Sequence, residues 1–310
     1  MLQFIALNED LQKVANTQLG EKPSRIAEDL LALRTWIETQ PHLKARTDDQ
    51  FLIQFLRGCK YSLEKAKQKL DIFFAMRTQC AELFNVTNVD DMAFRKFHNT
   101  GTLLFLPIPL NDNGPRIIFY RCNYAAQDFT LELVTQFVTA LHELAMISDP
   151  YACVNGISYV LDLSKLTLQH AMLLTPMYLK KIVQFFENTL PMRVNSLTVI
   201  NLSPAADHLQ RIIFSCFPEK IRKRIFICGR NFDDVSSHIP RKYFPLEYGG
   251  ENGSLAQLVE ENNKLWDKYR NYFKGNADYG TNERLRFGKQ LKFGDNLGMT
   301  GGSFRKLDVD

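Results

Sequence analysis

The His and Cys residues of this 310-residue sequence, which often carry catalytic or metal-binding chemistry, are not grouped in any such motif. Its six His residues occupy positions 42, 98, 142, 170, 208 and 238, and only His142 has an adjacent acid, Glu143. No second His follows four residues later, as the helix of a zinc protease would require. The six Cys residues (59, 80, 122, 153, 216 and 228) include no C-x-x-C pair. We therefore predict free core thiols and expect no metal cofactor.

Motifs that activate a nucleophile or cradle a phosphate are missing as well. The sequence contains no G-x-S-x-G elbow, no G-x-x-x-x-G-K-[ST] loop and no G-x-G-x-x-G turn after a strand. Asp162 ends a predicted strand and could be catalytic, since such positions in open α/β sheets often are. The alternative, which we favour, is that Asp162 caps the following turn with Ser164. Binding is therefore favoured over catalysis.

Composition narrows the class of protein further. The 38 Lys and Arg residues against 34 Asp and Glu leave a charge of +4, too small to indicate nucleic-acid binding by itself. A hydrophobic fraction of 45% excludes disorder of the whole chain. Neither a transmembrane run of about 18 apolar residues nor a signal peptide is recognisable, so we expect a cytosolic protein. The 23 Phe predict an aromatic core, and some of them could line an apolar cavity.

The elements that would position a site fall into three segments. Residues 1–95 predict an N-terminal helical bundle, with a helix after Pro23, a capping box at Thr47 to Gln50 and a third helix capped by Ser62. Residues 96–274 alternate between strands and helices, which is typical of βαβ units and a mainly parallel sheet. Residues 275–310 hold seven of the 16 Gly and are expected to be disordered or laid along the body. The predicted strands cover 102–106, 116–121, 157–163, 196–201 and 224–228, and the predicted helices after residue 100 cover 130–147, 168–188, 204–217 and 254–273.

Five stretches, in the same order along the chain, resemble the CRAL-TRIO lipid-binding family. Phe55 to Ala66 is similar to its N-terminal helical domain, Gly114 to Arg121 to its first sheet strand, and Asn155 to Leu163 to its central strand. Pro245 to Gly250 resembles the closing motif of the family, and Gly302 to Leu307 a tail common among insect members. The α-tocopherol-transfer and retinaldehyde-binding branch is the most similar subgroup.

This resemblance implies a lipid carrier rather than an enzyme. In the family a mixed, mainly parallel sheet flanked by helices forms the floor of an apolar cavity, a gate helix closes it, and one lipid is exchanged at a membrane. The implied ligand is a tocopherol, retinoid, carotenoid or similar isoprenoid, and no cofactor is needed. A phosphatidylinositol-type carrier is the alternative, although a buried headgroup would require polar partners that the matching positions lack. A lipid-sensing scaffold and an α/β enzyme are the remaining alternatives.

The resemblance also assigns the walls of the cavity. A period of two places Ile157, Tyr159 and Leu161 on one face of a strand, although ordinary core is the favoured interpretation of each residue taken alone. His142 would be the one polar contact, suited to a hydroxyl or carbonyl of the ligand. The predicted gate, residues 204–217, is more polar than usual for the family. The full expected set is Val138, His142, Ile157, Tyr159, Leu161, Ile182, Phe185, Phe186, Leu190, Leu197, Val199, Ile212, Ile213, Phe214 and Phe217.

Positive charge is concentrated beside the predicted gate. Residues 180–230 contain nine basic and three acidic residues, a net +6, so the rest of the chain sums to −2. Such a cluster suits an anionic membrane surface, and the alternative is a solvated charged face. The resemblance implies that Arg193, Lys220 and Arg224 grip a phosphoinositide headgroup, with Asn195 at a fourth position that is basic in the family. We expect transient membrane contact through Arg193, Lys220, Arg222, Lys223 and Arg224.

Overall fold

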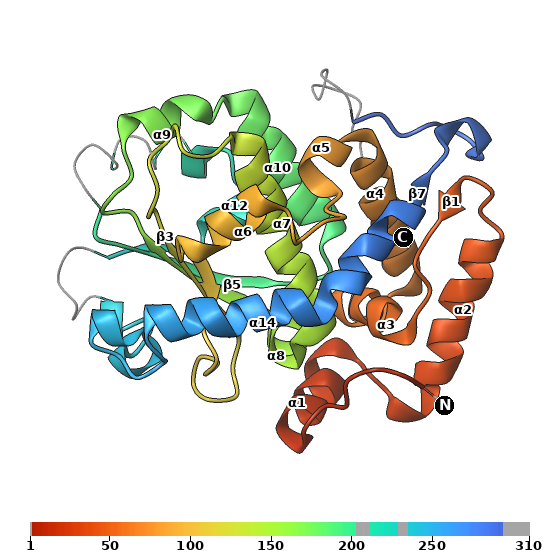
Figure 1. Ribbon diagram of the computed structural model, residues 1–310. Helices are drawn as coiled ribbons and strands as arrows, with labels where there is room; N and C mark the ends of the chain where they lie inside the picture. Colours follow the sequence, from red (N-terminus) through yellow and green to blue (C-terminus); the bar gives the residue numbers. More distant parts are fainter. Residues whose placement is uncertain (1, 203–206, 208–210, 212, 229–234, 294–310) are drawn as a thin grey trace.

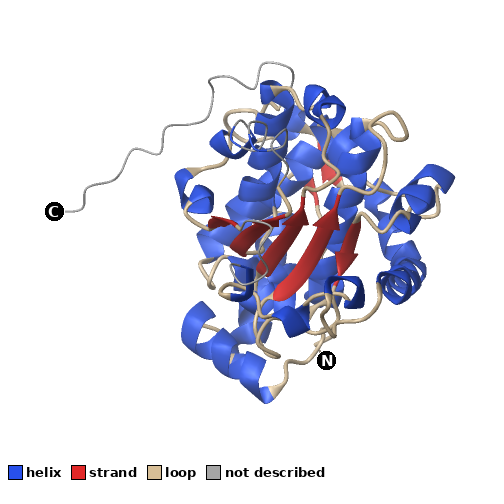
Figure 2. Ribbon diagram, turned by 90° about the vertical axis from the view of Figure 1, so that its left-hand side faces the viewer, coloured by secondary structure: helices blue, strands red, loops and turns tan. Residues whose placement is uncertain are grey.

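The computed structural model describes residues 2–202, 207, 211, 213–228 and 235–293. A group of N-terminal helices stands beside a sheet that carries helices on both faces (Figures 1 and 2). Their shared core is rich in Phe, as the composition predicts, with edge-to-face contacts such as that between Phe55 and Phe73. The N-terminal elements are α1 (Glu9–Val14), α2 (Ile26–Glu38), β1 (Leu43–Lys44), α3 (Asp49–Gly58), α4 (Leu63–Gln79), α5 (Ala81–Phe84) and α6 (Met92–Asn99).

The central sheet has the order β2-β3-β4-β5-β6. Strand β2 pairs antiparallel with β3, and the other three pairs are parallel. This confirms the predicted α/β class with a mixed, mainly parallel sheet. The strands are β2 (Leu103–Phe105), β3 (Arg116–Arg121), β4 (Ile157–Asp162), β5 (Val194–Ile200) and β6 (Ile225–Ile227). The helices of this part are α7 (Leu131–Ser148), α8 (Pro150–Asn155), α9 (Leu168–Leu173), α10 (Pro176–Thr189), α12 (Glu219–Arg222) and α14 (Leu255–Lys274).

Two local predictions are wrong, each for a reason of backbone chemistry. The single helix expected over 168–188 is divided into α9 and α10, because Pro176 lacks an N–H and disfavours helical geometry in the residue before it. Helix α3 is capped by Asp48, which accepts from the backbone N–H of Phe51 at 2.9 Å, and not by Thr47. Helix α14 begins with a capping box formed by the Ser254 hydroxyl and the Gln257 side chain. Residues 204–206, 208–210 and 212 of the predicted gate helix lie outside the described residues.

The C-terminal part of the chain returns to the N-terminal helices. Helix α14 runs across the front of Figure 1 from the sheet to the bundle. Strand β7 (Gly280–Thr281) then pairs antiparallel with β1. The guanidinium of Arg286 donates to the carboxylate of Asp71 on α4, at 2.8 Å for its second bond. The segment 275–293 therefore lies along the body of the protein, while 294–310 is outside the described residues.

A buried ion pair joins the two parts of the molecule. Arg77 on α4 donates from Nη1 to Oε1 of Glu143 on α7 at 2.8 Å, and both side chains are buried. The same carboxylate accepts from the hydroxyl of Tyr272 at 2.9 Å and from the amide of Asn276 at 3.2 Å. Oε1 of Glu143 thus accepts three hydrogen bonds, and α4, α7 and the end of α14 are held at one point.

We expect Arg77→Met to lower the free energy of unfolding by about 3–5 kcal/mol, because it leaves the Glu143 carboxylate buried without its cation. Adding Glu143→Leu to this variant should restore most of the loss, since no buried charge then remains. Urea denaturation followed by circular dichroism measures both. The control is Arg25→Ala, which removes an exposed pair with Glu28 and should cost less than about 1 kcal/mol. A loss for Arg77→Met no larger than that of the control would contradict the assignment.

Candidate functional site

The predicted cavity residues of the sheet share one face. In the parallel register Tyr159 stands beside Leu197, and Leu161 stands beside Val199. The next strand continues the second row, because Val199 is paired with Ile227. Neighbours in register point to the same side of a sheet. We call these five residues the open face.

The open face is less completely covered than the opposite one. Tyr159 and Leu161 are half-buried, and Ile227 is 52% exposed, although Leu197 and Val199 are buried. The other side of the sheet, formed by Ile117, Phe119, Val160 and Ile200, is fully buried against residues from 235–258. We call it the sealed face. Apolar area that a protein leaves uncovered inside its fold is the kind of surface on which a ligand can be bound.

Helices α7 and α10 carry the next predicted residues, and His142 with Phe186 links both helices to Tyr159 of the open face. Val138 and His142 lie on α7, and Ile182 and Phe186 lie on α10. The ring of His142 meets that of Phe186 edge-on, with centroids 4.8 Å apart. Val138, Ile182 and Phe186 are half-buried, like Tyr159. Strand β4 and helices α7 and α10 therefore meet around His142.

Some predicted wall residues lie elsewhere. Phe185 stacks on Phe84 of α5 at 3.9 Å between ring centroids, and Leu190 joins the same apolar cluster of the N-terminal helices. Ile157 is fully buried in the cluster formed with α7 and α14. In the gate segment Ile213, Phe214 and Phe217 are half-buried, and the rings of the two Phe residues are 5.9 Å apart. Ile212 lies outside the described residues.

His142 already has a protein partner for each ring nitrogen. Nδ1 lies 2.6 Å from the carbonyl oxygen of Val138, and Nε2 lies 2.5 Å from the hydroxyl of Tyr159. Burial lowers the pKa of His142 to about 4, so the ring is neutral near pH 7. Burial also raises the pKa of Tyr159, which keeps its proton. Both ring nitrogens of His142 are therefore occupied by partners within the protein.

A second polar group stands at the carboxyl end of β3, and sequence reasoning missed it. The Sγ of Cys122 lies 3.4 Å from Nε2 of His170, and Nδ1 of that His is 2.8 Å from the hydroxyl of Thr167. A Cys beside a His can form a nucleophilic thiolate. Here burial raises the pKa of Cys122, which keeps it a thiol. Its partner His170 is 48 residues away in sequence, so no local spacing signals the pair.

Asp162 is held as a structural residue. Its carboxylate accepts from the backbone N–H of Ser164 at 2.9 Å and from the hydroxyl of Tyr248 at 2.6 Å. The first of these bonds is the turn cap that we favoured from the sequence. Within the described residues no three His, Cys, Asp or Glu side chains are placed to hold a metal ion. The helices that the structure describes include none long and apolar enough to cross a membrane.

The predicted basic residues gather at the amino ends of β5 and β6. Arg193 donates to the carbonyl of Val154, and Arg224 donates to the carbonyl of Val194. Burial lowers the pKa of Arg193, and the charge of Arg224 lowers it further, so the two guanidiniums are close. Lys220, Arg222 and Lys223 on or beside α12 are exposed, as is Asn195. Of these, Lys223 is paired with Glu219 at 2.8 Å.

A further cation comes from the N-terminal helices. Lys69 on α4 donates to the carbonyls of Glu187 and Leu190 at 2.8 and 3.3 Å. Burial lowers the pKa of Lys69, and the positive charge of Lys220 lowers it further. In the described part of the chain, neither lysine forms an ion pair with a carboxylate. We call Lys69, Arg193, Lys220 and Arg224 the basic cluster; sequence reasoning missed Lys69 because it resembles an ordinary surface lysine of α4.

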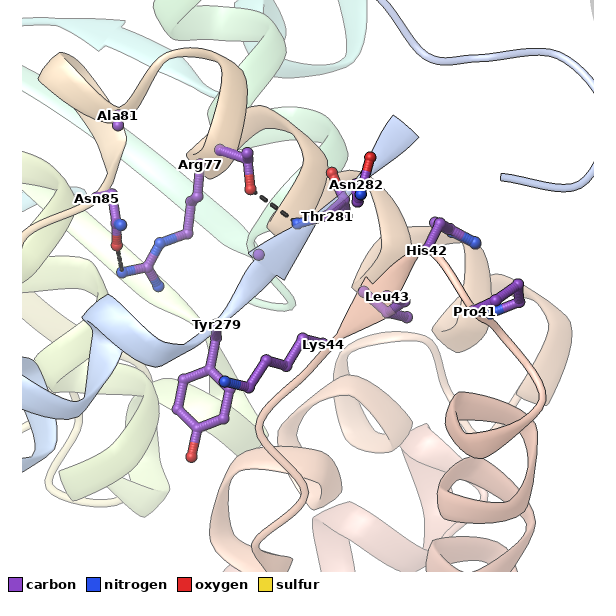
Figure 3. Close-up of a pocket in the computed structure, with 12 residues that line it drawn as sticks. Pro41, His42, Leu43, Lys44, Arg77, Ala81, Asn85, Tyr279, Thr281 and Asn282 are labelled. Carbon is purple, nitrogen blue, oxygen red and sulfur yellow. Dashed lines mark hydrogen bonds between the residues drawn. The ribbon is translucent and has the colours of Figure 1, made fainter. Parts of the chain in front are cut away.

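A groove of about 420 Å³ lies away from these residues, between the N-terminal helices and the segment around β7. Figure 3 shows Lys44 and Tyr279 side by side on one side of β7, with His42 directed away from them. Arg77 in this groove already donates to Asn85 at 2.9 Å and to Glu143. None of the predicted site residues lines it, and we assign it no function.

Comparison with known proteins decides the family. Residues 99–250 match the family described as "CRAL/TRIO domain", and residues 22–94 match the one described as "Pinta-like, UBA domain". The chain belongs to the CRAL-TRIO family. The predicted family is thereby confirmed, and four of the five sequence stretches lie within the matched residues, whereas Gly302 to Leu307 lies outside them.

Several relatives of this CRAL-TRIO chain are known by name. "Alpha-tocopherol transfer protein-like" of Homo sapiens is 29% identical over 253 residues, covering 81% of this chain and 72% of the relative. "Clavesin-2" of Rattus norvegicus is 29% identical over 244 residues, covering 78% and 74%. The crystal structure of Sfh5 is 14% identical and covers 82% of this chain and 92% of its own, with a TM-score of 0.47.

The neutral His142 predicts a specific pH dependence of stability. In the unfolded chain this imidazole is protonated below its ordinary pKa of 6.5, whereas the folded value is about 4. The contribution of the neutral His142 to the free energy of unfolding is therefore fully present above pH 6.5 and is lost as the pH falls toward 4. The loss amounts to about 3 kcal/mol, since one pKa unit is worth about 1.4 kcal/mol. Urea unfolding between pH 7 and pH 4 should show this extra loss in the wild type and not in His142→Gln; parallel curves would exclude a neutral buried His142.

Proposed function

We propose that this CRAL-TRIO chain is a cytosolic carrier that binds one hydrophobic lipid against the open face and exchanges it at anionic membranes. The observation that supports this most strongly is the contrast between the two faces of one sheet. The sealed face is packed by the chain's own residues, whereas Tyr159, Leu161 and Ile227 keep apolar area uncovered. A lipid in that position would replace side chains that a closed core would supply.

The chemistry of the open face favours an isoprenoid-type lipid. The half-buried residues around it, Val138, Leu161, Ile182 and Phe186, are apolar, and Tyr159 with His142 adds one polar point. A tocopherol, retinoid or carotenoid has a matching pattern of one small polar group on a large apolar body. A phosphate headgroup would need several buried donors, because an unpaired charge in such surroundings is very costly.

We propose that residues 204–217 form the gate, with Ile212, Ile213, Phe214 and Phe217 toward the ligand.

The state of two polar residues, Cys122 and Asp162, supports transfer rather than catalysis. The protonated Cys122 and the capping bonds of Asp162 leave neither residue activated for chemistry. A human relative carries the words "transfer protein" in its name. We propose the same class of activity here, with no cofactor and no enzymatic step.

Membrane contact is supported by an apolar patch that sequence reasoning missed. Four large residues at α9 and the start of α10 are exposed to solvent. No Asp or Glu occurs between Leu163 and Phe186, while three Lys do. Exposed apolar side chains flanked by cations are the pattern of a surface that enters the headgroup region of an anionic bilayer. We call this the α9 patch: Leu168 (60% exposed), Met172 (67%), Leu173 (42%) and Met177 (61%).

The basic cluster supports a phosphoinositide as the preferred headgroup. The charge of Arg224 lowers the pKa of Arg193, and the charge of Lys220 lowers the pKa of Lys69, so the cations of each pair are close together. Like charges held together without carboxylate partners favour a polyvalent anion, which relieves their repulsion. A phosphoinositide carries several phosphates on one headgroup and so fits this requirement better than a lipid with a single charge.

A substitution that fills the open face tests the lipid site. Val138→Phe should displace lipid yet leave the free energy of unfolding of the lipid-free protein nearly unchanged, because the added ring occupies uncovered space. Native mass spectrometry of the protein purified from its own tissue should show one bound lipid in the wild type and loss of it in this variant. Extraction of that lipid identifies an isoprenoid or, as the competing result, a phospholipid.

The matched control is Val160→Phe on the sealed face. It adds the same ring to a fully buried position and should cost about 1–3 kcal/mol of stability through overpacking. If Val138→Phe destabilises the lipid-free protein as much, the open face is ordinary core. Absence of lipid from every wild-type preparation would also refute the carrier function.

Two surface variants separate the apolar and electrostatic parts of membrane binding. The double variant Leu168→Glu/Met172→Glu should weaken sedimentation with every vesicle, since both changes place charge on the α9 patch. Lys220→Ala should weaken binding about fivefold to vesicles with phosphoinositide, near 1 kcal/mol for one basic residue, and leave neutral vesicles unaffected. Leu31→Glu, at an equally exposed position on α2, is the control and should bind like the wild type. Equal binding by all three variants would contradict both surfaces.

A further inference from the structure

The protons of the His142 and Tyr159 pair can be assigned from the atoms that surround them. The carbonyl oxygen of Val138 can only accept, so Nδ1 of His142, 2.6 Å away, must carry a proton. Because the ring is neutral, Nε2 then has none and presents a lone pair. The hydroxyl of Tyr159, 2.5 Å from Nε2, must therefore donate its only proton to the imidazole.

This arrangement leaves Tyr159 as an acceptor alone. A phenolic oxygen has one proton and two lone pairs, and the proton is already used. In the described part of the chain, His142 is its one hydrogen-bond partner, and the half-buried ring reaches the open face. Donation to His142 also polarises the O–H bond, which strengthens the oxygen as an acceptor.

We infer that Tyr159, oriented by His142, selects lipids whose polar end is a hydrogen-bond donor, an alcohol or phenol, over the matching aldehyde or ether. A ligand hydroxyl can donate to the free lone pair of the Tyr159 oxygen. An aldehyde or ether oxygen would place its own lone pairs against it and leave both unpaired, which is unfavourable in an apolar site. This inference rests on the proposed function, since it concerns a lipid bound at the open face. It assigns Tyr159 as the residue that contacts the ligand and His142 as a positioning residue.

The experiment compares lipids that differ only at the polar end. The full chain is titrated with all-trans-retinol and all-trans-retinaldehyde, and with α-tocopherol and its methyl ether, by quenching of tryptophan fluorescence. The donor of each pair should bind about tenfold more tightly, the ratio given by one hydrogen bond of about 1.4 kcal/mol. In Tyr159→Phe, which removes one oxygen atom, the two members of each pair should bind equally.

His142→Leu supplies the readout that a merely structural role would not move. With the imidazole gone, the Tyr159 proton is free to be donated to a ligand, so the preference for retinol over retinaldehyde should disappear or reverse. The ¹⁵N shifts of His142 in the wild type should show the Nδ1-protonated tautomer, which tests the proton assignment even if this variant folds poorly.

The results that would overturn this inference differ from the result that would overturn the proposed function. Equal binding of alcohol and aldehyde by the wild type, an undiminished preference in Tyr159→Phe, or the Nε2-protonated tautomer would overturn this inference and leave the carrier function standing. If the wild type binds none of the four lipids, the proposed function fails and the inference fails with it.

Discussion

The constraint on which this structure depends is that both faces of an apolar sheet must be covered. The sealed face meets it with the chain's own residues, as Phe119, Val160 and Ile200 show. On the other side α7 packs against Ile157, whereas Leu161 is only half-buried and Ile227 is exposed. Burying apolar area is worth roughly 25 cal/mol per Å², so an incompletely covered face is a standing driving force for binding something apolar.

The N-terminal helices and the C-terminal segment make that incomplete face possible. A sheet with one partly open face gains less free energy from packing than a fully covered sheet. Contacts elsewhere in the chain provide stabilisation in its place. Glu143 joins α7 to α4 and to the end of α14, and Phe185 on α10 packs into the N-terminal cluster through Phe84. The two helices that border the open face are thus held from behind.

The sequence predicts the strands well because their signal is local. Alternation within Ile157 to Asp162 and the short apolar runs around it are enough to place β4 and its neighbours. We predicted that Phe185 and Phe186 both lie at the cavity wall, because they are adjacent and equally apolar. They lie about 100° apart on the helix, so one joins the N-terminal cluster and the other meets His142. With apolar neighbours on both sides, the helical pattern could not tell which face would meet which.

Contacts between distant residues could not be predicted in this way. Tyr159 follows His142 by 17 residues on a different element, and Lys69 precedes Lys220 by about half the chain. Each pair depends on how helices dock, which no spacing encodes. The family resemblance implied that the polar residue His142 lies at the cavity wall, and His142 contacts Tyr159 of the open face. Only the packing shows that both of its ring nitrogens already have partners within the protein. For this reason the proposed ligand contact is Tyr159 and not His142.

The placement of charge supports the same division of roles. The basic cluster stands at the amino ends of β5 and β6, whereas Tyr159 and Leu161 lie further along the strand direction on an apolar face. A cation beside the open face would lose hydration without gaining a partner, so an apolar cargo and an anionic headgroup need separate sites. Under the proposed function these two sites, held apart on one sheet, can be occupied together, so that a membrane anion would not compete with the lipid. The neutral His142 completes this separation, because it adds hydrogen-bonding specificity to the open face without adding charge.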